Sequence, residues 1–178
     1  MDSRKVLGVG IVGGGFIGHF HVRSWLGVRD ADVVSVMSRT LASAKSLAAT
    51  AEAIGVGTNV SAVDDILELI RDPRVDAIWV LTPNYARLDV VRTICDEVTS
   101  GRAELKGIAI EKPLGRTVEE AAEVYRLVTE AGLLHGYLEN QVFSPAITRA
   151  HELLWNRAVP SAGTPYLARA AEEHSGPH

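Results

Sequence analysis

The sequence has little of what marks secreted, membrane or nucleic-acid-binding proteins. Its single cysteine, Cys95, cannot form an internal disulfide, so we expect a reducing, cytoplasmic location. No apolar run approaches the length of a membrane span, and residues 1–15 lack the apolar core and cleavage site of a signal peptide. Lysine and arginine form no run and the net charge is −4, which disfavours nucleic acid as a partner.

The sequence does contain enough apolar material for a folded core. Hydrophobic residues make up 47% of its 178 residues, which favours a globular protein over a disordered chain. This length suits one well-cored domain, or one domain with part of another.

Short apolar runs alternate with helical patterns along most of the chain. The runs are nearly continuous, as strands buried on both faces are. We expect strands at residues 6–12, 32–38, 76–82, 107–110 and 133–138. Alternation of strands and helices specifies a parallel sheet with helices on both faces. The predicted fold class is therefore α/β, a doubly wound parallel sheet of the Rossmann type.

Two places show the spacing of a capping box, in which side chains satisfy the free backbone N–H groups of a helix start. Ser61 and Asp64 precede one apolar helical face, and Thr117 and Glu120 precede another. We therefore expect helices to begin at both places.

The pattern changes towards the end of the chain. Ser144 and Pro145 have the residue types of a helix start, and residues 165–171 alternate as a strand of a second sheet would. We predict a first domain at residues 1–145. Residues 146–178 would form a connecting helix and the start of a truncated α+β domain. An unpaired strand there would be an exposed edge, so we expect self-association into a homo-oligomer.

The stretch VGIVGGGFIGHFH, residues 9–21, carries the clearest motif. Gly13, Gly15 and Gly18 form G-x-G-x-x-G between the first expected strand and a helix expected over about residues 16–26. In this context the glycines permit a tight turn, close approach to a pyrophosphate, and close packing of the helix on the sheet. The amino end of the helix attracts phosphates. The stretch predicts a dinucleotide site; the alternative is a turn without a ligand.

The end of the second expected strand bears on which dinucleotide binds. NAD-binding loops usually have an acidic residue about 20 positions further on, which holds the ribose hydroxyls. Here Ser38, Arg39 and Thr40 stand at that place. An arginine with two hydroxyls suits a 2′-phosphate, so we expect NADP in preference to NAD. The alternative is that Arg39 is only a solvated residue at a helix start.

Two more polar clusters follow strands: TPN at residues 82–84 and EKP at residues 111–113. Ligands of open α/β sheets bind beyond the carboxyl ends of the strands. Lys112 is the one lysine in these clusters. A lysine there can hold a developing negative charge or lose its proton on desolvation; the alternative is an ordinary surface lysine.

In this order, the glycine loop, TPN, EKP and GYLENQVFSP resemble the Gfo/Idh/MocA family, the relatives of glucose-fructose oxidoreductase and inositol dehydrogenase. The resemblance implies a dinucleotide-binding domain followed by a substrate domain built on an open sheet. It also implies an NAD(P)-dependent oxidoreductase. Hydride would pass between the nicotinamide and a secondary alcohol or ketone of a sugar, cyclitol or related polyol.

The resemblance implies roles for single residues. Lys112 would be catalytic, aiding proton movement or orienting the reacting oxygen, and the Lys112–Pro113 bond would be cis. Asn140 or Gln141 would reach the nicotinamide side. The implied cofactor-binding residues are Gly13, Gly15, Phe16, Ile17, Gly18, Ser38, Arg39, Thr82, Pro83, Asn84, Glu111, Lys112 and Asn140.

The sequence departs from the family in two places. Arg87 stands where the family often has a histidine, three residues after Asn84. The second-domain motif, with an Asp and a His that acts as general acid or base, is absent. A non-catalytic dinucleotide-binding protein, a sensor or a remnant, therefore stays open beside the enzyme.

Other chemically active residue types have packing explanations. His19 and His21 flank the phosphate helix and are expected at the surface; the alternative is that one of them contacts phosphate. Cys95 lies on an apolar helical face and is expected to be a buried structural cysteine. His174 and His178 lack the spacing of zinc ligands, so no metal is expected.

Overall fold

The computed structural model describes residues 6–169 and residue 171. The chain divides into two compact units, Met1–Leu138 and Glu139–His178, which are described separately. The domain boundary predicted at residue 145 stays a prediction, as does the assignment of the last residues to a second domain.

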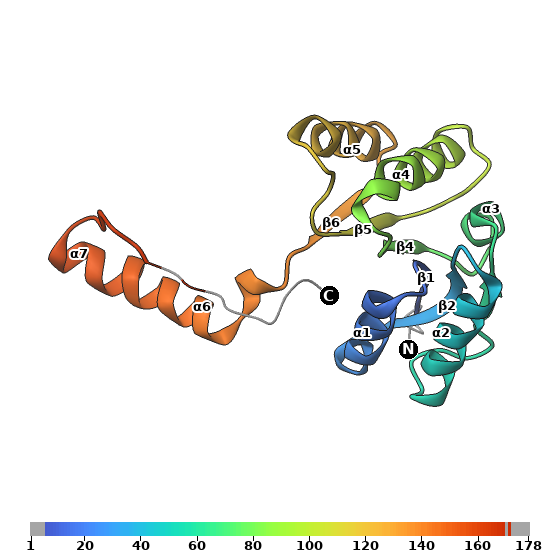
Figure 1. Cartoon of the computed structure of the whole chain (residues 1–178), viewed down its shortest axis with the longest axis horizontal. Helices are drawn as coiled ribbons and strands as arrows, with labels where there is room; N and C mark the ends of the chain where they lie inside the picture. Colours follow the sequence, from blue (N-terminus) through green and yellow to red (C-terminus); the bar gives the residue numbers. More distant parts are fainter. Residues whose placement is uncertain (1–5, 170, 172–178) are drawn as a thin grey trace, which may run out of the picture. The chain divides into compact units, whose positions relative to one another are not determined.

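A six-stranded sheet forms the centre of the first unit, with strand order β3-β2-β1-β4-β5-β6 (Figure 1). All its neighbouring strands pair in parallel. The strands are β1 (Leu7–Val12), β2 (Ala31–Met37), β3 (Ser61–Val63), β4 (Ala77–Val80), β5 (Gly107–Glu111) and β6 (Leu134–Leu138). The order reverses between β1 and β4, which makes the space after these two strands the switch point where ligands bind in such folds. The predicted doubly wound α/β fold is confirmed.

Helices cover both faces of this sheet. They are α1 (Phe16–Ser24), α2 (Leu41–Ala53), α3 (Ile66–Ile70), α4 (Asn84–Thr99) and α5 (Val118–Glu130). Side chains alternate along β1 because successive strand residues point to opposite faces. Val9 and Ile11 join the core under α1 and α2, whereas Val12 joins the core under α3, α4 and α5.

One expected helix start is confirmed and the other is wrong. Thr117 precedes α5, and its hydroxyl accepts a hydrogen bond from the Glu120 backbone N–H at 3.3 Å. Ser61 instead belongs to strand β3, which the sequence reading missed because only three residues pair with β2. Asp65 caps α3, and its carboxylate accepts from the Leu67 N–H at 2.9 Å.

Cys95 lies in α4 and is buried, as expected for a structural cysteine. Burial raises the pKa of its thiol to about 11. Among the described residues, no helix is both long and apolar enough to cross a membrane.

The second unit is mostly helical over residues 141–162. A 3-10 turn (Gln141–Phe143) is followed by α6 (Pro145–His151), a π-helical segment (Glu152–Ala158) and α7 (Val159–Ala162). Ser144 precedes α6 and Pro145 opens it, as predicted, although Ser144 makes no side-chain capping bond. Residues 163–169 and 171 form no strand, so the strand expected at residues 165–171 is wrong for its described part. His174 and His178 lie outside the described residues.

Candidate functional site

Three predicted motifs lie on neighbouring strands at one edge of the sheet. The glycine loop follows β1, TPN follows β4 and EKP completes and follows β5. Val12 is paired with Val80, and Val80 with Ile110, so the three strands end at the same level. The fold therefore brings together residues that are about 100 positions apart in the sequence. We call this side of the sheet the carboxyl edge.

The backbone of the glycine loop has no room for side chains where it turns. Gly13 has φ +128°, and a Cβ there would lie 2.8 Å from the Leu81 carbonyl oxygen. A Cβ on Gly18 would lie 2.3 Å from the Gly13 carbonyl oxygen, so this glycine lets α1 pack against the loop. Gly15 is different, because nothing lies within 4 Å of its Cβ position. A ligand can therefore approach the backbone at Gly15, directly before the first turn of α1.

Ser38 and Arg39 follow β2 beside this loop. A Cβ on Gly14 would lie 3.0 Å from the Cβ of Ser38, which places Ser38 against the glycine loop. Arg39 is exposed, and no acidic residue in the described part of the chain pairs with it. Thr40 caps α2 by accepting from the Ser43 N–H at 3.3 Å, so its hydroxyl is already engaged. Of the two predicted hydroxyls, only that of Ser38 is uncommitted to a helix cap.

TPN spans the end of β4 and the start of α4. Pro83 is exposed and precedes α4, and Asn84 is its first residue. The hydroxyl oxygen of Thr82 is buried and has no hydrogen-bond partner among the described residues. A buried polar atom without a partner is uncommon in folded proteins and calls for an explanation such as a ligand.

In EKP, the Glu111 side chain is in contact with another side chain, whereas the Lys112 side chain is exposed. Glu111 lies with a carboxylate oxygen 3.3 Å from Nε2 of His21, and the two side chains are 12% and 19% exposed. Lys112 is exposed, and the Lys112–Pro113 bond is cis, as expected. His21 is half-buried rather than fully exposed at the surface, because α1 packs it against the end of β5. His19 is also half-buried, with Nδ1 3.3 Å from the Thr50 hydroxyl.

Arg87 links TPN to EKP through hydrogen bonds, a contact that the sequence does not predict. The residue is 3% exposed, and its guanidinium donates to the Thr82 carbonyl at 2.5 Å and to the Pro113 carbonyl. Burial lowers the pKa of this guanidinium, and the negative charge of Glu111 opposes that shift. The available signal was a basic residue in the first turn of a helix that begins directly after a strand-end motif.

Asn140 belongs to the second unit. It precedes the 3-10 turn there, and its carbonyl accepts from the Phe143 N–H at 3.1 Å. Its predicted approach to the nicotinamide stays a prediction.

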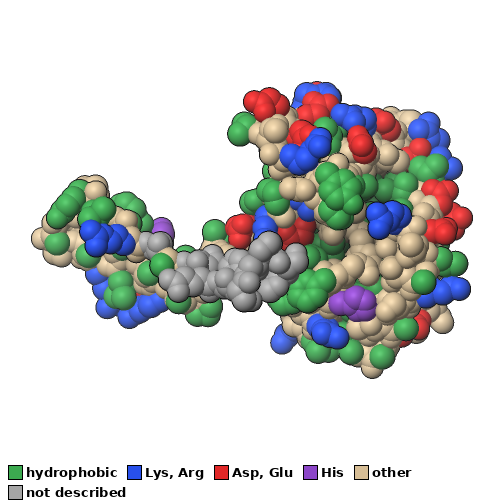
Figure 2. Space-filling model, in the orientation of Figure 1, with side chains coloured by type: hydrophobic (Ala, Val, Ile, Leu, Met, Phe, Trp, Pro, Cys, Tyr) green, Lys and Arg blue, Asp and Glu red, His purple; other side chains and the backbone are tan. Residues whose placement is uncertain are grey.

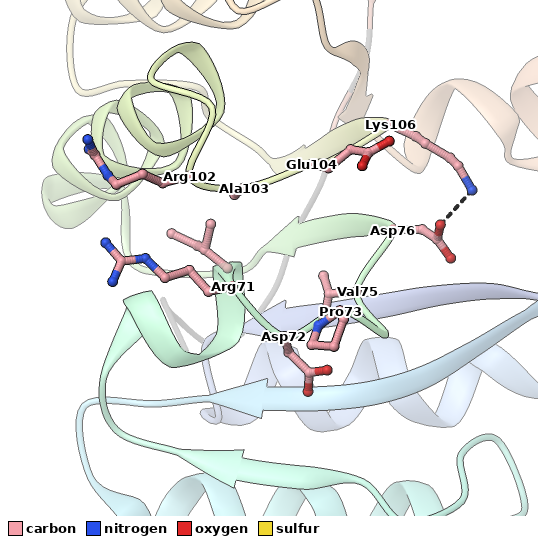
Figure 3. Close-up of a pocket in the computed structure, with 10 residues that line it drawn as sticks. Arg71, Asp72, Pro73, Val75, Asp76, Arg102, Ala103, Glu104 and Lys106 are labelled. Carbon is pink, nitrogen blue, oxygen red and sulfur yellow. Dashed lines mark hydrogen bonds and ion pairs between the residues drawn. The ribbon is translucent and has the colours of Figure 1, made fainter.

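The opposite edge of the sheet, which we call the amino edge, holds a cavity of about 350 Å³ (Figure 3). The Lys106 and Asp76 side chains point toward one another at its rim, with Nζ 2.5 Å from the carboxylate. Arg71 and Arg102 both bind Glu97, which lies in α4. Most of the charges around this cavity therefore pair with one another, and among the described residues no buried polar side-chain atom without a partner lines it.

On the face of the first unit seen in Figure 2, acidic and basic side chains are interspersed. Among the described residues, no group of three or more His, Cys, Asp or Glu side chains is arranged to hold a metal ion.

Known proteins resemble this chain along most of its length. The Gfo/Idh/MocA family, described as "Oxidoreductase family, NAD-binding Rossmann fold", matches residues 7–137. The chain is 35% identical over 127 residues to 1,5-anhydro-D-fructose reductase of Ensifer adhaerens, covering 71% of this chain and 34% of the relative. It is 27% identical over 158 residues to levoglucosan dehydrogenase of Pseudarthrobacter phenanthrenivorans, covering 86% of this chain and 38% of the relative.

A solved structure shows the same fold. GenD2 from gentamicin A biosynthesis, in complex with NAD, superposes with a TM-score of 0.69 and 26% identity over 87% of this chain and 40% of that one. This chain thus spans well under half the length of these relatives. The family match and the carboxyl-edge geometry agree: the chain belongs to the Gfo/Idh/MocA oxidoreductase family, which has an NAD-binding Rossmann fold.

Proposed function

We propose that this chain is the dinucleotide-binding part of an NAD(P)-dependent oxidoreductase that acts on a sugar, cyclitol or related polyol. The observation that carries the proposal is the assembly of the glycine loop, TPN and EKP on three adjacent strand ends. The names of the two curated relatives, a reductase and a dehydrogenase of anhydro sugars, support the substrate class.

The residues present fit a nicotinamide dinucleotide. The open backbone at Gly15 admits a pyrophosphate, because nothing occupies the space where a side chain would stand. The Thr82 hydroxyl, at the carboxyl edge where the nicotinamide end would lie, is buried without a partner among the described residues. The residues that would hold the cofactor are Gly13, Gly15, Phe16, Ile17, Gly18, Ser38, Arg39, Thr82, Pro83, Asn84, Glu111, Lys112 and Asn140. The cofactor, when bound, supplies the carbon that gives or takes the hydride.

The chain's own contribution to the reaction centres on EKP. Lys112 is exposed at the strand end, and its ammonium would hydrogen-bond the reacting oxygen of the substrate. Glu111, held by His21, places its carboxyl group beside that position. In this arrangement Lys112 orients the substrate oxygen and stabilises charge that develops on it.

NADP is the proposed preferred cofactor. Arg39 is exposed beside Ser38 and its guanidinium can bind a 2′-phosphate through two N–H groups. The NAD bound to GenD2 belongs to that protein and favours the other choice. Binding experiments on this chain can decide between them.

The test is a fluorescence titration of the purified chain with NADPH and with NADH. We expect NADPH to bind at least about tenfold more tightly, and Arg39→Asp to remove that difference, because it replaces a charge-assisted pair with repulsion. Arg29→Asp is the matched control, since Arg29 is also exposed but precedes β2 at the amino edge. Equal binding of the two dinucleotides would contradict the NADP preference, and binding of neither would contradict the cofactor site.

A further inference from the structure

The two residues next to Lys112 in the sequence, Glu111 and Pro113, are each contacted by a side chain from a helix. Glu111, on one side, contacts His21 of α1 at 3.3 Å. Pro113, on the other side, accepts a hydrogen bond from Arg87 of α4. Lys112 itself is exposed, so its position depends on how well these two neighbours are fixed.

Placing the charged Arg87 side chain in the buried space between TPN and EKP costs free energy. Its side chain is 3% exposed, and its Nε has no hydrogen-bond partner among the described residues. Burying a charged group carries a large desolvation penalty, and an apolar residue of similar volume often serves stability as well or better. Stability of the fold is therefore a poor explanation for a guanidinium at this position.

The geometry of the guanidinium suggests what it does instead. Two different nitrogens of Arg87 donate to two carbonyls, that of Thr82 at 2.5 Å and that of Pro113. Because the group is planar and rigid, it sets the spacing between the two strand ends in a way that a lysine ammonium cannot. Thr82 carries the unpartnered buried hydroxyl, and Pro113 directly follows Lys112.

Resting on the proposed function, we propose that Arg87 is a positioning residue for the nicotinamide half of the site. It holds TPN and EKP at a fixed separation, so that the Thr82 hydroxyl and Lys112 meet the nicotinamide and the substrate oxygen together. The adenosine half of the site, at Gly15 and Arg39, does not depend on it.

The experiment measures the affinity of the folded chain for two ligands. NADPH fills both halves of the site, whereas 2′-phospho-ADP lacks the nicotinamide and the ribose attached to it and fills only the adenosine half. We expect Arg87→Met to lower the affinity for NADPH about tenfold or more and to change the affinity for the fragment less than twofold. Arg92→Met is the matched control, because Arg92 also lies in α4 but is 42% exposed and pairs with Asp89. It should change neither affinity.

A second variant separates charge from geometry. Arg87→Lys keeps the positive charge but has no planar fork, so we expect it to show the same selective loss for NADPH. Equal losses for the two ligands, or no loss, would overturn the positioning role. If neither variant folded, as shown by thermal unfolding, Arg87 would be a structural residue and the inference would be wrong. Wild-type chain that binds neither NADPH nor NADH would instead overturn the proposed function.

Discussion

The amino and carboxyl edges of the sheet both carry charged side chains, but the two edges differ in how completely their polar groups are paired. At the amino edge, Lys106 pairs with Asp76, and Glu97 receives both Arg71 and Arg102. At the carboxyl edge, the Thr82 hydroxyl and the Arg87 Nε are buried without partners among the described residues. The 350 Å³ cavity lies at the first edge, while the family motifs lie at the second.

For the proposed site, cavity size is a poor guide to where the ligand binds. A cavity lined mostly by charges that already pair with one another offers little to a ligand, because binding would have to break those pairs. Buried polar atoms without partners offer more, since a ligand can supply the missing hydrogen bonds. The comparison can be tested by changing residues at each edge and measuring stability and dinucleotide binding separately.

The largest effect is expected at Gly13. Gly13→Ala places a Cβ 2.8 Å from the Leu81 carbonyl at φ +128°. We expect a loss of about 3 kcal/mol in the free energy of unfolding, measured by urea denaturation, together with loss of NADPH binding. Gly101→Ala is the control: its φ is +72° and its surroundings are open, so stability should fall by about 1 kcal/mol and binding should not change. Normal NADPH binding by the Gly13 variant would contradict the assignment of the loop.

A smaller effect, confined to stability, is expected at Glu97. Arg71 and Arg102 lower the pKa of this carboxyl from 4.5 to about 2. A lowered pKa stabilises the fold above the ordinary pKa, and the stabilisation is lost as the pH falls from about 4.5 towards 2. We expect Glu97→Gln to lower the melting temperature by a few degrees at pH 7, and this difference from wild type to shrink steadily below pH 4.5.

Dinucleotide binding measured at pH 7 is the companion measurement for Glu97→Gln. It should be unchanged, because Glu97 lies in the last turn of α4 and its two arginines line the amino-edge cavity, whereas TPN lies at the other end of this helix. A melting temperature difference that does not depend on pH would mean that the two arginines do not stabilise the fold through the ionised carboxylate.

A smaller effect on dinucleotide binding is expected at His21, at the carboxyl edge. His21→Ala removes the contact with Glu111, and we expect the affinity for NADPH to fall about fivefold, since one such hydrogen bond contributes about 1 kcal/mol. His19→Ala is the neighbouring control, because His19 contacts Thr50 instead. Equal effects of the two variants would show that helix α1, rather than the contact with Glu111, matters for binding.

The smallest effect is expected at Lys106. The pair with Asp76 is short, but the Lys106 side chain is 55% exposed, and exposed ion pairs contribute about 0–1 kcal/mol. Lys106→Met should change the free energy of unfolding by less than about 0.5 kcal/mol and leave binding unchanged. A clear change in NADPH binding would mean that the amino-edge cavity takes part in function.

Local sequence patterns predicted most of the architecture, but they did not predict the short strand β3 or the irregular end of the described chain. The five expected strands and the helix start at Thr117 rest on periodicity and spacing within a few residues. Strand β3 has only three residues and is paired through its backbone, so the local pattern at Ser61 predicts a helix cap where the structure has a strand. Residues 165–169 alternate in the sequence but form no strand in the structure, because alternation creates a strand only where a partner strand is present.

The sequence by itself determined the fold class and the motif positions, because glycine spacing and hydrophobic period are properties of neighbouring residues. Only the tertiary structure decided which side chains meet. His21 and Glu111 are 90 positions apart, and Arg87 and Pro113 are 26 apart. Contacts over such separations leave no periodic signal, since they arise from the order of strands in the sheet. The parallel sheet brings these residues to one edge, and there a basic residue of α4 becomes part of the candidate site.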